Sequence, residues 1–191
     1  MTGPLEVLLD FTHVLDGLGI KYVVVGSFAS SARGLQRATR DVDILAQIGL
    51  DEVDSIYESL SDRYYIDRLS VRSAVINRSH FNAIHLDSMF KVDVYVHGDS
   101  DRLSQQQLIR RLPEKISADS DAIIYFATAE DTLLAKLVWY RKGCQTSDRQ
   151  WADVLGIIRL QGERLDRAYL EGWAEQLEIK ELLIQALAQA L

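Results

Sequence analysis

Two aspartates interrupt an apolar run at positions 41 and 43, where the chain reads DVDIL. The alternation of these acids with Val42 and Ile44 predicts a strand, in which side chains two residues apart leave the same face. Asp41 and Asp43 would then point the same way from α-carbons about 7 Å apart, and their like charges would repel. A hard divalent ion such as Mg²⁺ could offset this repulsion, because it takes oxygen ligands. For a D-x-D pattern on its own, the simpler interpretation is a turn contact for one acid and solvent for the other.

A third aspartate stands in a similar setting later in the chain. Asp93 interrupts residues 91–96, KVDVYV, a run rich in β-branched side chains. If this strand lies beside the strand that contains Asp41 and Asp43, the three carboxylates meet on one face of a sheet. Buried carboxylates are seldom left unpaired, because an isolated charge in apolar surroundings is strongly unfavourable. The three acids together therefore predict a metal site.

A glycine-serine pair follows the first predicted strand, which covers residues 22–25. Gly26 has no Cβ to keep a ligand from the backbone, and the start of a short helix over residues 28–33 would attract an anion. Ser27 can add a hydroxyl donor. The alternative is an ordinary strand-to-helix turn in which Ser27 caps the helix. The combination of this turn with the paired acids in one strand-helix-strand unit favours a phosphate site.

The hydrophobic pattern predicts an α+β fold in two parts. Residues 1–128 would form a mixed, twisted sheet with helices on one face, and residues 129–191 a C-terminal helical bundle. The predicted helices of the first part cover residues 5–18, 28–33, 51–60 and 103–111. The predicted strands cover residues 22–25, 41–45, 64–69, 73–77, 81–86, 91–96 and 122–127.

Charge and composition restrict the partners. The formal net charge of -7 argues against a broad surface for gripping nucleic-acid phosphates, although it does not exclude a focused anion site. The single cysteine, Cys144, cannot form an internal disulfide, and no basic, apolar leader opens the sequence. No apolar run approaches the length of a membrane span. We therefore expect a cytoplasmic protein that does not enter a membrane.

The order of these motifs resembles that of the nucleotidyltransferases of the DNA polymerase β superfamily. The segment VVGSFASSARGLQRATRDVDIL followed by KVDVYV carries the resemblance, and within the superfamily it is most similar to small bacterial AbiEii-type proteins. The resemblance implies that a nucleoside triphosphate such as ATP lies with its phosphates against Gly26 and Ser27. It also implies two Mg²⁺ ions on Asp41, Asp43 and Asp93. A nucleoside monophosphate would then pass to an acceptor, with Asp93 activating the acceptor and pyrophosphate leaving.

Two cations are further candidates for phosphate contacts. Arg40 directly precedes the paired aspartates, and Lys136 lies in EDTLLAKL, which is similar to the helical region after the core in such proteins. The alternative for Lys136 is that it is simply solvated or ion-paired, as a long cation on a helix usually is. The resemblance leaves the acceptor open among a small molecule, a protein and RNA, in a resistance or a toxin-antitoxin role with a cognate antitoxin as partner. The alternative is a non-catalytic regulator on the same fold, which binds nucleotide or a partner protein.

Overall fold

The computed structural model describes residues 3–33, 41–115 and 122–190. Within them the chain divides into two compact units. The first contains the described residues of Met1–Phe28 and Ala38–Ala127, and the second those of Ala29–Arg37 and Thr128–Leu191. None of the described helices is long and apolar enough to cross a membrane.

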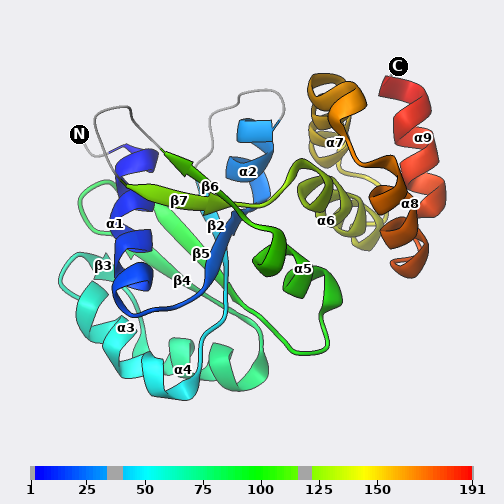
Figure 1. The fold of residues 1–191 in the computed structure, drawn as a ribbon. Coiled ribbons are helices and arrows are strands. Elements are labelled where there is room, and N and C mark those ends of the chain that lie inside the picture. The colour runs from blue at the N-terminus through cyan, green and yellow to red at the C-terminus, as the bar shows by residue number, and fades with distance from the viewer. Residues whose placement is uncertain (1–2, 34–40, 116–121, 191) are drawn as a thin grey trace. The chain divides into compact units, whose positions relative to one another are not determined.

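The first unit alternates strands with helices (Figure 1). Its helices are α1 (Pro4–Gly17), the start of α2 (Gly26–Arg33), α3 (Val53–Leu60), α4 (Arg68–Asn77) and α5 (Arg102–Arg110), with a 3₁₀ turn at Leu50–Glu52. Its strands are β1 (Tyr22–Val25), β2 (Asp41–Ala46), β3 (Tyr64–Tyr65), β4 (His80–His85), β5 (Lys91–Val96), β6 (Leu112–Lys115) and β7 (Ile123–Phe126).

All of these strands form a single seven-stranded sheet in the order β3-β4-β5-β2-β1-β7-β6. The sheet is mixed, because β2 runs parallel to β5 and β1 runs parallel to β7, while the other neighbours are antiparallel. The strand that carries the paired aspartates, β2, is therefore central. It lies between β5, which carries the third aspartate, and β1, which leads into α2.

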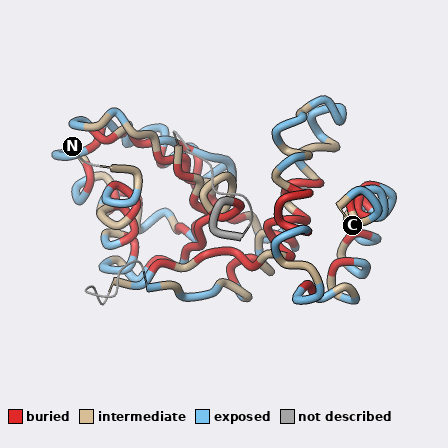
Figure 2. The backbone as a smooth tube through the Cα atoms, turned by 90° about the horizontal axis from the view of Figure 1, so that it is seen from above, coloured by how far each residue is buried: buried red, intermediate tan, exposed pale blue. Residues whose placement is uncertain are grey.

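One face of this sheet is fully buried. Val24, Ile44 and Val94 are inaccessible to solvent, and buried stretches follow the strands in Figure 2. Helices α1, α3 and α4 pack together and cover this face (Figure 1). The ring of Phe11 on α1 makes an edge contact with the ring of Tyr64 on β3, with centroids 5.6 Å apart. A continuous apolar layer of this kind stabilises the sheet and fixes which side chains must point the other way.

The opposite face is covered only in part within this unit. Leu108 of α5 packs with Val23, Leu45 and Ala127 in a small buried cluster. Because Val23 and Leu45 alternate with Val24 and Ile44, this cluster lies on the side away from α1. The paired aspartates share this side with Leu45, two and four residues before it.

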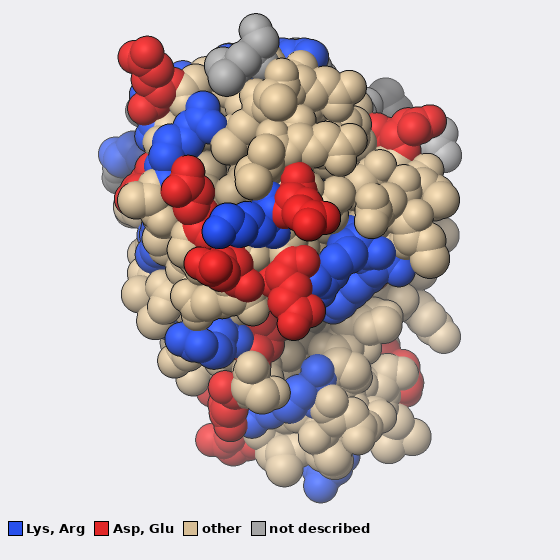
Figure 3. Space-filling view, turned by 90° about the vertical axis from the view of Figure 1, so that its right-hand side faces the viewer, with Lys and Arg blue, Asp and Glu red and all other residues tan. Residues whose placement is uncertain are grey.

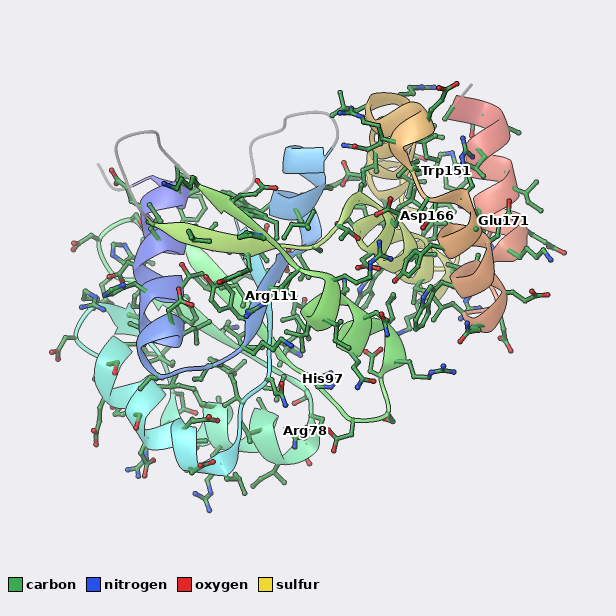
Figure 4. All side chains as sticks on the ribbon, in the orientation of Figure 1. Arg78, His97, Arg111, Trp151, Asp166 and Glu171 are labelled. Atoms are coloured by element: carbon green, nitrogen blue, oxygen red, sulfur yellow. The ribbon has the colours of Figure 1, made fainter. Side chains whose placement is uncertain are left out.

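The outer hairpin of β6 and β7 is attached to β1 through Arg111, which is labelled in Figure 4. Its Nη1 donates a hydrogen bond to the carbonyl oxygen of Tyr22 at 2.6 Å. Its guanidinium also lies 3.9 Å from the ring centroid of Tyr125, a cation-π contact. The hydrogen bond to Tyr22 thus adds to the parallel pairing of β7 with β1, whereas the contact with Tyr125 lies within the hairpin.

The predicted α+β class is confirmed, but one predicted strand is wrong and another is too long. Of the predicted strand 64–69, only Tyr64–Tyr65 form β3, and helix α4 begins at Arg68. Residues 73–77 lie in helix α4 and not in a strand. The Asp67 side chain caps this helix by accepting from the Ser70 N–H, and its C-terminal neighbour Arg78 adopts a left-handed conformation with φ of 48°. Val71, Ala74 and Val75 are buried at helical spacing, so packing overrode the local β-branched character. Strand β6 was not predicted, because its LPEK sequence has no apolar alternation.

The second unit contains the helices that follow Thr128. They are α6 (Ala129–Lys142), α7 (Asp148–Gln161), α8 (Arg167–Gln176) and α9 (Lys180–Ala190), with a 3₁₀ turn at Gly162–Arg164 between α7 and α8. Helix α6 packs on α7 and α8, and α9 packs on α7 and α8. The side chain of Thr128 caps α6 by accepting from the Asp131 N–H at 3.1 Å. The buried carboxylate of Asp131 accepts a hydrogen bond from the Tyr169 hydroxyl at 2.6 Å.

Candidate active site

The three aspartates lie on one face of the sheet. The parallel register of β2 and β5 places Asp43 beside Asp93 and Asp41 beside Lys91. Neighbours in register point to the same side, and so do residues two apart along a strand. Asp93 is 8% exposed, whereas Asp41 and Asp43 are half-buried. The arrangement concentrates negative charge where solvent screens it incompletely.

The apolar residues between the acids determine this orientation. Val42 and Ile44 of β2, and Val92 and Val94 of β5, are all fully buried on the opposite face. A slip of one residue would bury the acids and expose these side chains, so the register is strongly determined. The same hydrophobic alternation that predicts the strands therefore directs the carboxylates toward the other side.

Lys91 is a member of the site that the sequence pattern did not single out. Its Nζ lies 2.6 Å from Oδ2 of Asp93, and 42% of its side chain is exposed. The hydrogen bond to Asp93 raises the pKa of Lys91, and the charges of Asp93, Asp41 and Asp43 raise it further against the opposing effect of burial. The signal was available in the K-x-D spacing of KVDVYV, because residues two apart in a strand share a face.

Tyr95 shares this face, and both burial and the charges of the three aspartates affect the pKa of its hydroxyl. Burial raises the pKa of its hydroxyl to about 12, and the charges of Asp43, Asp93 and Asp41 act in the same direction. A phenolate would add a further negative charge beside the carboxylates, which explains the sign of the effect. All three acids therefore lie near enough to this hydroxyl to affect its pKa.

The glycine turn lies against one of the acids. Val25 pairs with Asp43, and α2 begins at the next residue, Gly26, which has a φ of +61°. A Cβ at Gly26 would lie 2.6 Å from Cγ of Asp43 and would overlap its carboxylate. Only glycine fits both the backbone conformation and this approach. Ser27, the second residue of α2, is half-buried at the same turn.

On the other side of Asp93, strand β4 presents exposed polar side chains. Asn82 is in register with Asp93, and His80 is in register with Tyr95. Both β4 residues are exposed, and the rings of His80 and Tyr95 have centroids 5.7 Å apart. A molecule that reached Asp93 across this side of the sheet would therefore meet an amide and an imidazole first.

The donors of the site suit a hard divalent ion, because they are carboxylate oxygens. Among the described residues, however, no group of three or more His, Cys, Asp or Glu side chains is already arranged to hold a metal ion. The pairing of Asp93 with Lys91 gives one reason, since it engages a carboxylate oxygen with a protein cation. The three aspartates suit a divalent ion because they supply carboxylate oxygens on one face of the sheet. One of them, Asp93, is ion-paired with Lys91.

The two other predicted phosphate contacts are not placed at this cluster by the structure. Arg40 lies outside the described residues. Lys136 belongs to the second unit, where its side chain is 5% exposed and its Nζ lies 2.8 Å from Oδ2 of Asp153. It also donates to Oε1 of Gln150 at 3.1 Å. A contact of either cation with nucleotide stays a prediction.

Comparison with known proteins identifies the fold. No family model matches the sequence, and no curated protein matches it. Among solved structures, the antibiotic-resistance factor ANT(2″)-Ia in solution superposes with a TM-score of 0.56 at 11% identity, over 100% of this chain and 96% of that one. The chain has a nucleotidyltransferase fold.

Two further structures share this nucleotidyltransferase fold. A crystal structure of ANT(2″)-Ia in complex with adenylyl-2″-tobramycin gives a TM-score of 0.58 at 10% identity, over 90% of this chain and 95% of that one. An antigenic nucleotidyltransferase-like protein from Paracoccidioides brasiliensis gives 0.54 at 15% identity, over 95% and 90%. The nucleotidyltransferase-type sheet predicted from the sequence is thereby confirmed, while membership of the AbiEii-like group stays a prediction.

Proposed function

We propose that the protein is a nucleotidyltransferase, which moves a nucleoside monophosphate from a nucleoside triphosphate such as ATP to an acceptor and releases pyrophosphate. The observation that carries the proposal is the position of Asp43, which lies beside Asp93 and directly against the Gly26 turn. A carboxylate pair thus lies beside the glycine turn that we propose as the phosphate-binding backbone. The fold shared with ANT(2″)-Ia supports the same activity class.

Asp41, Asp43 and Asp93 would hold Mg²⁺, with two ions implied by the superfamily resemblance. When bound, such ions stabilise the attacking and leaving oxygens of an in-line displacement. The protein contributes the orientation of the three carboxylates, which the buried valines and isoleucine on the other face keep fixed. Asp93, the most buried of the three, would accept the proton of the acceptor hydroxyl.

The strand order gives the site a direction. Across the sheet, the Gly26 turn after β1 is followed by Asp43 on β2, Asp93 on β5 and Asn82 on β4. Neighbouring strands lie about 4.8 Å apart, so a triphosphate at the turn and an acceptor over β4 would flank the acids. Backbone N–H groups of the turn, with Ser27, Arg40 and Lys136, are the proposed nucleotide contacts.

A small acceptor is favoured over RNA. On the face shown in Figure 3, acidic side chains lie beside basic ones, and the described residues form no extended basic surface there. RNA-binding surfaces usually concentrate positive charge. One similar structure contains an adenylylated small molecule, adenylyl-2″-tobramycin. A small hydroxylated acceptor in a resistance role is therefore preferred to the toxin-antitoxin role.

The remaining parts of the proposal follow from the sequence motifs. The chain would belong to the AbiEii-like group and act in the cytoplasm, where nucleoside triphosphates and Mg²⁺ are abundant. A toxin-antitoxin role would add a cognate antitoxin as a partner protein. The motif Gly-Ser, Asp-x-Asp and the later Asp in KVDVYV supports the group assignment.

The test is a labelling experiment with matched variants. The protein is incubated with each of the four α-labelled nucleoside triphosphates, Mg²⁺ and cell extract, and pyrophosphate release and label transfer are followed. Asp43→Asn should lower transfer by about 100-fold or more, as loss of a charge-stabilising group does. Asp54→Asn is the control, because Asp54 lies on α3, away from the three aspartates in the sheet, and forms an exposed ion pair with Arg68 of α4. Equal activity of Asp43→Asn and the wild type would refute the proposal.

A non-catalytic regulator is the second candidate, and one observation favours it. Lys91 holds Asp93, and no group of three acids among the described residues is arranged for metal. This function predicts tight binding of a non-hydrolysable nucleotide or of a partner protein without turnover of any nucleotide. Calorimetry together with the labelling experiment distinguishes the two functions.

A further inference from the structure

Lys91 lies in the middle of the acid cluster. Its Nζ is 2.6 Å from Oδ2 of Asp93, and the register places its residue beside Asp41. Across the β2-β5 pair, Asp43 is therefore in register with another carboxylate, Asp93, and Asp41 is in register with Lys91. Among the described residues of the cluster, Lys91 supplies the positive charge.

Such a cation has an electrostatic effect on both states of the site. Without metal, like charges on adjacent strands repel, and an ammonium among them relieves that repulsion. With metal, the same ammonium repels the ion and competes for the Asp93 oxygen that it already contacts. Pair contacts between charges on exposed surfaces are weak, but Asp93 is 8% exposed, so this pair is better shielded than most.

We propose that Lys91 is a built-in counter-ion, which holds Asp93 in the metal-free protein and is displaced from it when a divalent ion binds. The proposal rests on the proposed function, since it takes the three aspartates as the metal ligands. Lys91 is thus a positioning residue that acts through Asp93. It keeps the acids together before the metal arrives and lowers the affinity for that metal.

The experiment measures metal binding and stability without any substrate. Lys91→Met removes the charge and keeps most of the apolar stem, while Lys91→Arg keeps the charge. Lys21→Met is the matched control, because it changes the net charge equally. Lys21 precedes β1 at the end away from Gly26, about 13 Å along the strand from Val25. There it lines a pocket of about 210 Å³ with Gln47 and His97. His97 is labelled in Figure 4.

Mn²⁺ alone, titrated by electron paramagnetic resonance at 0.15 M salt, reports the affinity. Lys91→Met should bind Mn²⁺ about tenfold more tightly than the wild type, because it removes the repulsion between the ammonium and the ion. At a separation of a few Å this repulsion is about 1.4 kcal/mol or more even at the dielectric constant of bulk water. Lys91→Arg and Lys21→Met should bind as the wild type does. Without metal, Lys91→Met should melt at a lower temperature than Lys21→Met. In an Asp93→Asn background the Lys91→Met change should lower the melting temperature less, because only the charges of Asp41 and Asp43 then remain beside Lys91.

Three results would overturn the inference, and they distinguish failure of the counter-ion role from failure of the metal site. If the wild type binds Mn²⁺ and Asp43→Asn does not, but Lys91→Met and Lys21→Met have equal affinities, the metal site stands and the counter-ion role is wrong. A lower Mn²⁺ affinity of Lys91→Met would refute the counter-ion role in the same way. If the wild type binds no Mn²⁺, the proposed metal site itself fails, and displacement of Lys91 fails with it.

Discussion

Replacement of Gly26 by alanine tests the close approach of the turn to Asp43. Gly26 has a φ of +61°, and a Cβ there would lie 2.6 Å from Cγ and 2.8 Å from Cβ of Asp43. The overlap involves the base of the Asp43 side chain and not only its carboxylate end. A rotation of the carboxylate alone cannot relieve it, so the strand or the turn must move.

The expected loss of stability has two parts. A left-handed backbone conformation destabilises alanine by about 1–2 kcal/mol. An overlap in packed surroundings adds about 1–3 kcal/mol. Gly19→Ala isolates the first part, because Gly19 has a φ of +69° and nothing within 4 Å of its virtual Cβ. Both glycines belong to the first unit. The difference between the two variants is therefore the overlap with Asp43.

Thermal unfolding followed by circular dichroism measures this difference. Gly26→Ala should melt about 2–12 °C below Gly19→Ala, given an overlap cost of about 1–3 kcal/mol and about 2–4 °C per kcal/mol for a chain of this size. Gly26→Ala should also weaken Mn²⁺ binding, whereas Gly19→Ala should not. Equal melting temperatures and equal Mn²⁺ affinities of the two variants would show that the turn does not position Asp43.

Three other predictions concern the rest of the molecule. Thr128→Val removes the cap of α6 and should lower the free energy of unfolding by about 1 kcal/mol in urea; no change would show that the cap contributes nothing. Lys136→Met removes the cation from the largely buried Lys136–Asp153 pair and should destabilise by about 3–5 kcal/mol, with part recovered when Asp153→Leu is added. Burial raises the pKa of Tyr64, so the folded state keeps a proton that the unfolded state loses, and stability should fall as pH rises above about 10. Tyr64→Phe should make that fall less steep in chemical denaturation at pH 8 to 11, and an unchanged slope would contradict the assignment.

Local patterns were sufficient where one face of an element is buried. The alternation around Asp41 and Asp43 predicted β2, because a half-buried strand shows its period of two directly. The same reasoning failed for residues 73–77, where a β-branched pair suggested a strand. The cap from Asp67 and the burial of Val71 and Val75 on one helical stripe form a helix there. Short apolar runs are ambiguous because both periods fit them.

The site was predictable in its acids and not in its cation. The three aspartates were found because charges within apolar runs are conspicuous, whereas a lysine at the start of a strand is ordinary. The importance of Lys91 depends on its contact with Asp93 and on its register with Asp41 on the neighbouring strand. The nucleotidyltransferase roles of these residues stay predictions until the variants are measured.

The sequence by itself determined which segments alternate, which side chains must leave the core together, and where only a glycine turn can follow a strand. These are properties of a few consecutive residues. Only the tertiary structure decided that β5 lies beside β2 in a register that pairs Asp43 with Asp93, and that Gly26 lies against Asp43. The two strands are separated along the chain by a 3₁₀ turn, α3, β3, α4 and β4. Their neighbourhood depends on how the whole apolar face packs, which no local pattern contains.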